Sequence, residues 1–261
     1  MTHTPLKIAL AATALLGAAP LAEAATLVAL TADNRLVRID STTRRATAPV
    51  AVRGADGALL GIDVRPTDGK LYGITANNQI VTIDPATGQA TQVARLSEPF
   101  VGGGRVVLDF NPMADRIRLM GMNGTSFRIH PDTGAVTRDG SLKYAAGTPL
   151  AETTPRVTAG AYTNSMAGAT ATMLFTIDTS LGQLNVQMPP NDGVQVVRGP
   201  VGTGLPAGIG FDILTEGTTN TAFLLAGGTL HTVNLETGAP TALGPVTGLP
   251  TAEITDIAAT R

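Results

Sequence analysis

The chain has 261 residues, of which 43% are hydrophobic, 15% charged and 3% aromatic, and its formal net charge is −2. This composition is too apolar for a disordered protein. Without a run of Lys or Arg, it also lacks the clustered cations that binding to nucleic acid requires. The 30 glycines and 17 prolines are typical of many short strands joined by tight turns, and not of a helical bundle.

The first 24 residues have the features of a secretory signal peptide. Lys7 precedes an apolar run, and Ala22-Glu23-Ala24 provides a small-x-small cleavage site. We therefore predict a signal peptide over residues 1–24, a single mature domain over residues 25–261, and a location in the periplasm or outside the cell. The alternative is a buried N-terminal helix. No other apolar run is long enough to span a membrane, and the chain has no cysteine, so the mature fold is held without disulfides.

A hairpin motif recurs along the chain. It combines a strand, a short turn with Asn or Gly, a second strand of alternating apolar and polar residues, and a polar turn. Four clear copies and a fifth, more divergent one span residues 27–47, 71–91, 117–137, 223–241 and 173–197. Equivalent positions at the end of the second strand are 44, 46, 57 and 47 residues apart: Asp40, Asp84, His130, Gln187 and Asn234. A period in the forties made of short strands is typical of β-propeller blades, which usually have four strands each.

The polar turn that closes the motif has its own pattern. Three copies end it with Thr-Gly, at Gly88, Gly134 and Gly238. Glycine suits a residue with positive φ, as in a type I turn followed by a bulge. The segment 191–193 (Asn-Asp-Gly) takes this place in the divergent copy. Arg44 holds the position in the first copy, so we expect a looser or differently shaped turn there.

A further strand precedes every hairpin except the first. The five strands are LGIDV (60–64), VLDFN (107–111), GAYTN (160–164), GFDIL (210–214) and ITDIA (254–258). The last one has no hairpin after it, and the hairpin at Leu27 has no strand before it. Pairing of these two ends would close the array and remove its open edges. The predicted fold is therefore all-β: a five-bladed β-propeller closed by pairing of the C-terminal strand with the N-terminal blade. The alternative is an open β-solenoid.

Several of these segments are similar to a secreted bacterial family known as domain of unknown function 4394. They are LGIDVRPTDGKLYGIT, TIDPATGQAT, LDFNPMADRIRL, RIHPDTGAVTRDGSLKYAAG and AYTNSMAGATATMLFTIDT. The resemblance covers nearly all of the mature chain, and the stretch from LDFNPMADRIR through KYAAG and AYTN is its most specific part. It implies a propeller-like repeat fold and export, and it supplies no reaction and no catalytic residues.

Carboxylates of the inner strands form the first candidate site. One equivalent position holds Asp63, Asp109, Asp212 and Asp256 in four blades, and Tyr162 in the fifth. If these carboxylates converge on the central axis they repel one another, and a hard cation such as Ca²⁺ would neutralise them. The alternative is structural. Each Asp would then accept hydrogen bonds from neighbouring backbone N–H groups and hold its own blade together, which explains its recurrence in every blade.

Blade three differs in sequence from the other four blades and provides the second candidate site. A long connection follows it (Ser141–Arg156), and unusual polar residues lie in it or nearby in sequence. The predicted ligand-binding residues are Asn111, Asp115, Arg116, Arg118, Tyr144, Tyr162 and Asn164. Arg and Tyr together can hold a carboxylate, phosphate or sugar by hydrogen bonds and stacking. The alternative is a surface Asp115–Arg116 pair beside a loop without function.

Known catalytic motifs are absent from the sequence. It has no thiol nucleophile, no Gly-x-Ser-x-Gly elbow and no Walker-type loop, and His130 and His231 lack metal-ligand spacing. We therefore expect a monomeric, secreted binding or scaffold protein without catalysis, whose partner is an extracellular small molecule, glycan or protein. The alternative is an extracytoplasmic hydrolase or lyase that uses a cation held by the inner-strand Asp residues. The sequence leaves the question of enzymatic activity open.

Overall fold

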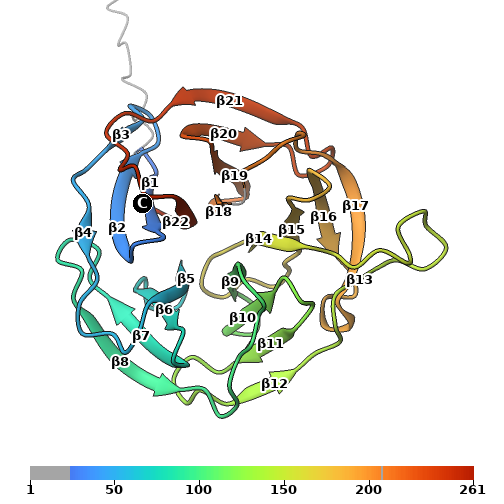
Figure 1. Ribbon diagram of the computed structural model, residues 1–261, viewed down its shortest axis with the longest axis horizontal. Coiled ribbons are helices and arrows are strands. Elements are labelled where there is room, and N and C mark those ends of the chain that lie inside the picture. Colours follow the sequence, from blue (N-terminus) through green and yellow to red (C-terminus); the bar gives the residue numbers. More distant parts are fainter. Residues whose placement is uncertain (1–23, 207) are drawn as a thin grey trace, which may run out of the picture.

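The computed structural model describes residues 24–206 and 208–261, so the predicted signal peptide, apart from its last residue, lies outside the described residues. Five sheets surround a central axis as the blades of a β-propeller (Figure 1). This arrangement confirms the predicted fold class. Within the described residues, the search for a helix long and apolar enough to cross a membrane finds none.

Each blade runs from an inner strand at the axis to an outer strand at the rim (Figure 1). Blade 1 consists of β22 (Ile254–Thr260), β1 (Thr26–Thr31), β2 (Arg35–Asp40), β3 (Arg45–Ala46) and β4 (Val50–Ala51). Blade 2 consists of β5 (Leu59–Val64), β6 (Leu71–Thr75), β7 (Gln79–Ile83) and β8 (Ala90–Arg95). Blade 3 consists of β9 (Val106–Asn111), β10 (Arg116–Gly121), β11 (Ser126–Ile129) and β12 (Val136–Arg138).

The last two blades complete the ring. Blade 4 consists of β14 (Val157–Tyr162), β15 (Leu174–Asp178), β16 (Gln183–Gln187), β17 (Val194–Pro200) and, beside β17, β13 (Lys143–Tyr144). A short 3₁₀ helix, η1 (Pro190–Asp192), joins β16 to β17. Blade 5 consists of β18 (Ile209–Glu216), β19 (Thr219–Ala226), β20 (Thr229–Val233) and β21 (Pro240–Pro245).

The two ends of the chain close the ring as predicted. β22 pairs antiparallel with β1, with Thr26 opposite Thr260 and Leu30 opposite Asp256. The C-terminal segment therefore supplies the inner strand that the first hairpin lacks. Closure leaves every inner strand between the inner strands of two neighbouring blades, which places the equivalent residues of all blades around one axis.

Side chains that alternate along the strands fill the spaces between blades. Fourteen buried apolar residues lie between blades 4 and 5, Phe175 and Phe211 among them. Clusters of similar size separate blades 5 and 1, 1 and 2, and 2 and 3. The cluster between blades 3 and 4 has six such residues among those described, and polar side chains occupy much of the remaining space.

The polar turns that close the repeated hairpins have the same backbone conformation although their sequences differ. Gly88 has φ 74° and Gly134 φ 71°, as their sequence positions predict. Arg44 adopts φ 54° and its N–H donates to Asp40 O at 2.8 Å, as the N–H of Gly88 does to Asp84 O at 2.8 Å. The expectation of a differently shaped turn at Arg44 is therefore wrong. The Asp40 carboxylate accepts bonds from two N–H groups within the turn, which helps to hold the left-handed residue in place.

Blade 4 departs from the repeat in a way that the sequence pattern did not predict. Part of the long connection Ser141–Arg156 forms β13, which pairs in parallel with the start of the outer strand β17. The rest of this connection extends outward beyond the ring (Figure 1). The inner strand β14 begins three residues before the predicted start at Gly160, and Asn164 lies past its end.

Candidate functional site

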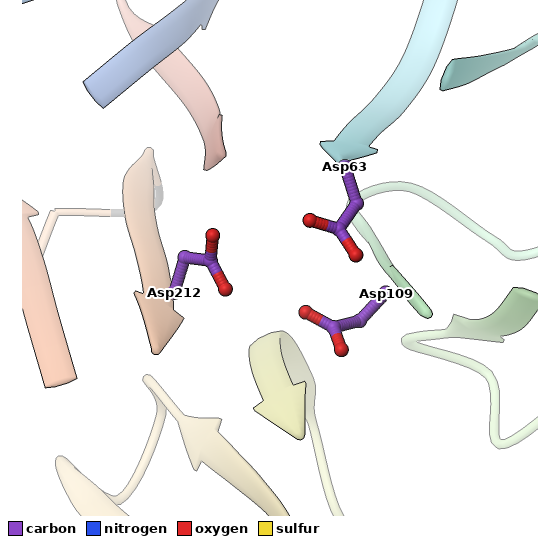
Figure 2. Close-up of side chains that lie close together, drawn as sticks. All are labelled: Asp63, Asp109 and Asp212. Atoms are coloured by element: carbon purple, nitrogen blue, oxygen red, sulfur yellow. The ribbon is translucent and has the colours of Figure 1, made fainter. Parts of the chain in front are cut away.

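Three of the four inner-strand aspartates meet at the axis. The carboxylates of Asp63, Asp109 and Asp212 face one another in the centre of the ring (Figure 2). One oxygen atom of each lies within 4.8 Å of the corresponding atoms of the other two. Asp256 is buried as well but does not belong to this group of three. The structure therefore brings together most of the predicted acidic set.

Each of the four carboxylates also joins two neighbouring blades. One oxygen accepts a hydrogen bond from a backbone N–H on the inner strand of the next blade around the ring. The bonds run from Phe110 N to Asp63 (2.7 Å), from Tyr162 N to Asp109 (2.9 Å), from Ala259 N to Asp212 (2.5 Å) and from Ile62 N to Asp256 (2.9 Å). The structural alternative had each Asp accept bonds within its own blade, and three of the four also do so, from the N–H of the following residue: Val64, Ile213 and Ile257. The bonds to the next blade come in addition and hold adjacent blades together.

A glycine two residues before the Asp allows this close approach in blade 2. A Cβ atom at Gly61 would lie 2.8 Å from Leu108 Cβ and 2.9 Å from Asp256 Oδ2, which no side chain tolerates without a shift. The same Gly-x-Asp spacing recurs at Gly210 in blade 5. The inner strands therefore approach closely enough for one side chain to reach the next backbone.

Burial sets the protonation of the cluster. It raises the pKa of Asp63 and Asp109 well above the usual value, and the neighbouring carboxylates add to the rise, while the backbone N–H bonds oppose it. Burial raises the pKa of Asp212 to about 6, and it raises that of Asp256 well above the usual value too. Near neutral pH the cluster therefore retains protons or requires a cation.

The donor set suits a hard cation. Ca²⁺ takes six to eight oxygen ligands, of which the three carboxylates could supply part. Their bonds to backbone N–H groups use only some of the lone pairs of each carboxylate. A Ca²⁺ site formed by Asp63, Asp109 and Asp212 remains a prediction, and Asp256 would lie outside it.

The structure separates the seven predicted ligand-binding residues into four places. Asn111, Asp115 and Arg116 form the turn between β9 and β10. Asn111 Oδ1 accepts bonds from two N–H groups of that turn, and Arg116 donates to two of its carbonyl groups. Asp115 pairs not with Arg116 but with Arg65 of blade 2, at 2.5 Å. These three residues hold the turn and the blade contact.

Arg65 is a residue that the sequence analysis missed. Its side chain is largely buried and pairs with both Asp115 and Asp132, while it also donates to the hydroxyl of Tyr72. Because the guanidinium donates to Asp115, the pKa of that carboxyl is lowered. The partners lie 50 and 67 residues away in sequence, so no local pattern indicates the pairing.

Arg118 and Tyr162 lie between blades 3 and 4. Arg118 is 1% exposed and donates to Asp139, Ser126, Tyr162 and Asn191, which engages four of the five N–H groups of its guanidinium. Asp139 also accepts from Arg128. Asn164 is elsewhere, bonded to Asn220 of blade 5. Arg118 thus connects the two blades through a polar network and leaves few donors for a ligand.

Tyr144 lies beside a pocket formed by the long connection. Tyr144 of β13 lies across the sheet of blade 4. Its hydroxyl donates to Asp178 (2.8 Å) and accepts from Gln183 (2.9 Å). A pocket of about 350 Å³ opens between the connection and β17. It is lined by Tyr144, Leu150, Gln183, Gln195, Val196 and Val197, with smaller residues of the connection. Among the described residues, none that lines it is charged.

A larger hollow of about 760 Å³ lies between blades 1 and 2. Residues of the strands and turns of blade 2 line most of it, with Asp84 and Thr87 of the closing turn among them. These two are bonded to each other, and Asp84 also accepts from Ala86 N–H. Because this hollow is formed by strands and turns that belong to the blade repeat, and by the end of β22, it is a weaker candidate than the pocket beside β13, to which a segment outside the repeat contributes.

Comparison with protein families identifies the chain. Residues 35–258 match the family described as "Domain of unknown function (DUF4394)". The chain belongs to this family. The match confirms the resemblance inferred from the repeated segments. Comparison with curated proteins finds no match.

Solved structures from Bacteroides species share features of the DUF4394 chain. A protein of unknown function from B. thetaiotaomicron has 13% identity and a TM-score of 0.54, over 91% of this chain and 65% of its own. A protein of unknown function from B. caccae has 10% identity and a TM-score of 0.48, over 92% and 100%. An auxiliary nutrient binding protein from B. ovatus has 14% identity and a TM-score of 0.46, over 76% of this chain and 55% of its own. Only the B. thetaiotaomicron protein has a TM-score above 0.5, and at 13% identity its likeness concerns the fold alone.

Proposed function

We propose that this protein is an exported binding protein without catalytic activity and that its ligand occupies the pocket beside β13. One observation carries the proposal: the connection that departs from the blade repeat builds a pocket of about 350 Å³ against β17. Loops that depart from a rigid scaffold are common sites of binding. Pockets of this size with apolar walls and a few polar groups suit small molecules.

The chemistry of the pocket favours binding over turnover. The hydroxyl of Tyr144 is already engaged with Asp178 and Gln183, and Thr148 donates to Ala145 O within the connection. The inner-strand carboxylates, on which the enzymatic alternative depends, serve as bridges between blades. Val196 and Val197 are 37% and 44% exposed, and they provide an apolar surface for a ligand.

A pocket-filling variant tests the location. We expect that a compound from a panel of uncharged sugars, amides and esters stabilises the wild type but not Val197→Trp. The matched control is Leu243→Trp, an exposed apolar position (37%) on the outer strand of blade 5, which should respond like the wild type. At a ligand concentration of 100 Kd the gain is about 2.7 kcal/mol, or roughly 5–10 °C in Tm.

Two results would contradict the proposed function. Equal shifts in Val197→Trp and Leu243→Trp would place binding elsewhere, and chemical conversion of a bound compound would show catalysis. Export requires a separate test, with the full chain and a variant lacking residues 1–24 expressed in a bacterial host. The full chain should be recovered outside the cytoplasm and shortened at Ala24, whereas the truncated variant should remain inside.

A further inference from the structure

The fifth strand of blade 4 stops early and leaves part of the outer edge of β17 open. β13 has two residues, Lys143 and Tyr144, which pair with the first two of the seven residues of β17. The chain then turns away: Gly147 has φ 74°, and Thr148 Oγ1 donates to Ala145 O at 2.7 Å. Beyond this turn, no strand in the described part of the chain pairs with the outer edge of β17.

The ladder between β16 and β17 fixes which backbone groups face this open edge. In an antiparallel pair, alternate residues of a strand bond to its neighbour. Met188 N donates to Val194 O, and in the same register Val196 bonds to its partner on β16. Gln195 and Val197, which alternate with these two, therefore turn their N–H and C=O groups towards the outer edge.

The outward groups of Gln195 and Val197 differ in their partners. Ala145 N donates to Gln195 O at 3.1 Å, so the segment of β13 pairs with Gln195. In the register of β13, Ala146 would lie opposite Val197, but the turn at Gly147 takes the chain away from this position. Among the described residues, no bond to the outward N–H or C=O of Val197 is found.

Val197 also lines the pocket beside β13. Its side chain lies on the same face of the sheet as that of Gln195 and, across the strand pair, that of Tyr144, and both of these line the pocket as well. Leu150 of the long connection contributes a further apolar wall. A molecule in the pocket therefore meets apolar side chains and, at its edge, one backbone donor and one backbone acceptor of the same residue.

The aromatic residues of the chain argue against a ligand that binds by stacking. The sequence has six Phe, three Tyr and no Trp, and all nine aromatic side chains are buried. Nucleobases and similar flat groups bind to exposed rings, which this surface does not provide. The recognition chemistry of the pocket edge is that of a strand edge, which pairs with another extended backbone.

We propose that the ligand of this pocket is an extended peptide segment that pairs antiparallel with β17 at Val197. This inference rests on the proposed function. In an antiparallel pair a single residue opposite Val197 exchanges both hydrogen bonds with it, whereas a parallel segment would bond through two separate residues. Opposite residues share a face of the sheet, so the side chain of that ligand residue lies in the pocket with Val197 and Leu150. Because the lining is uncharged, this side chain is aliphatic.

Capped pentapeptides of the form Ser-Ser-X-Ser-Ser test the ligand class. X is Leu, Asp or Lys, and a fourth peptide has N-methyl-leucine at X, which removes the N–H that would donate to the C=O of Val197. Dissociation constants for the wild type are measured by ligand-observed NMR. We expect the Leu peptide to bind at least about tenfold more tightly than the other three, because each of them loses a hydrogen bond or buries a charge.

Proline variants test the edge of the sheet. Val197→Pro removes an outward N–H and no bond of the ladder, so Tm should change little while the Leu peptide binds at least about tenfold more weakly. Val196→Pro removes a bond to β16 and should lower Tm. The matched control is Ala242→Pro on β21. Ala242 lies opposite His231 and, like Val197, directly precedes a shift of register, so it is the corresponding outward position of blade 5. This variant should bind the Leu peptide as the wild type does.

The outcomes separate this inference from the proposed function. The inference is wrong if the N-methyl-leucine peptide binds as tightly as the Leu peptide, if Val197→Pro binds like the wild type or loses as much Tm as Val196→Pro, or if no peptide binds. In each case the binding function stands when a compound of the panel stabilises the wild type and not Val197→Trp. The binding function itself fails if the panel and the peptides leave these two proteins indistinguishable.

Discussion

The two faces of blade 4 differ in the side chains that pack against the neighbouring blades. Towards blade 5, fourteen buried apolar residues pack without directional constraint. Towards blade 3, six apolar residues share the interface with a network around Arg118 and a second one around Tyr144. An apolar interface tolerates imperfect geometry, whereas a buried polar one requires a partner for every atom.

The largest loss of stability at the polar interface should follow from replacement of Arg118. Arg118→Met leaves the Asp139 carboxylate, whose side chain is 3% exposed, with Arg128 alone. We expect a loss of about 3–5 kcal/mol in the free energy of unfolding, measured with urea. Phe211→Ala, in the apolar interface, should cost a similar amount, about 3–5 kcal/mol.

A second substitution tells the two losses apart. Asp139→Leu added to Arg118→Met removes the uncompensated charge and should restore part of the stability. No single added substitution has that effect in Phe211→Ala, where the loss comes from a cavity. If the double variant is less stable than Arg118→Met, the polar interface does not behave as an ion-pair network.

The sequence was sufficient for the fold because the signals for it are local. The strand alternation and the closing turn, with Gly88 and Gly134 in two of its copies, recur along the chain. Closure followed from a hairpin without an inner strand at one end and an inner strand without a hairpin at the other. The site depends on contacts between blades, such as Tyr162 N–H with Asp109, which lie 53 residues apart. Arg65 gives no signal in the sequence for the same reason, because its partners Asp115 and Asp132 lie on blade 3.

The inner-strand aspartates that bridge the blades should make the stability of the protein depend on pH. Asp109 links blade 3 to blade 4, whereas Tyr162 occupies the equivalent position in blade 4. Because burial raises the folded pKa of these carboxyls above the unfolded value, their contribution is complete below about pH 4 and is lost as pH rises through the folded pKa, which for Asp212 is about 6. We expect stability to fall by about 1–3 kcal/mol between pH 4.5 and 7.5.

Asp109→Asn is the control for that measurement. It retains an acceptor for Tyr162 N–H and removes one charge next to Asp63 and Asp212. The decline of stability with pH should become shallower in this variant, as judged from urea denaturation at several pH values. An unchanged slope would mean that the cluster does not govern the pH dependence.

Calcium offers a direct test of the acidic cluster. If Asp63, Asp109 and Asp212 bind Ca²⁺, the ion at ten times its Kd should add about 1.4 kcal/mol to the stability of chelator-treated protein near pH 7.5. Metal analysis after dialysis gives the stoichiometry. Asp109→Asn should lose the response, whereas Asp256→Asn, outside the group of three, should keep it. Indifference of the wild type to both Ca²⁺ and chelator would leave the cluster with its bridging role alone.

The smallest effect should come from Tyr144→Phe, and it isolates what the polar interface contributes beyond packing. The ring remains, while Asp178 loses one donor but still accepts from Arg156 N–H at 2.8 Å. Gln183 loses its acceptor at the partly exposed edge, where water can replace it. We expect a loss of about 1 kcal/mol, close to that of Ile177→Val in the apolar interface. Only Tyr144→Phe should also change the affinity of the pocket for its ligand. Equal binding by both variants would show that the hydroxyl serves the bonds within blade 4 and not the pocket.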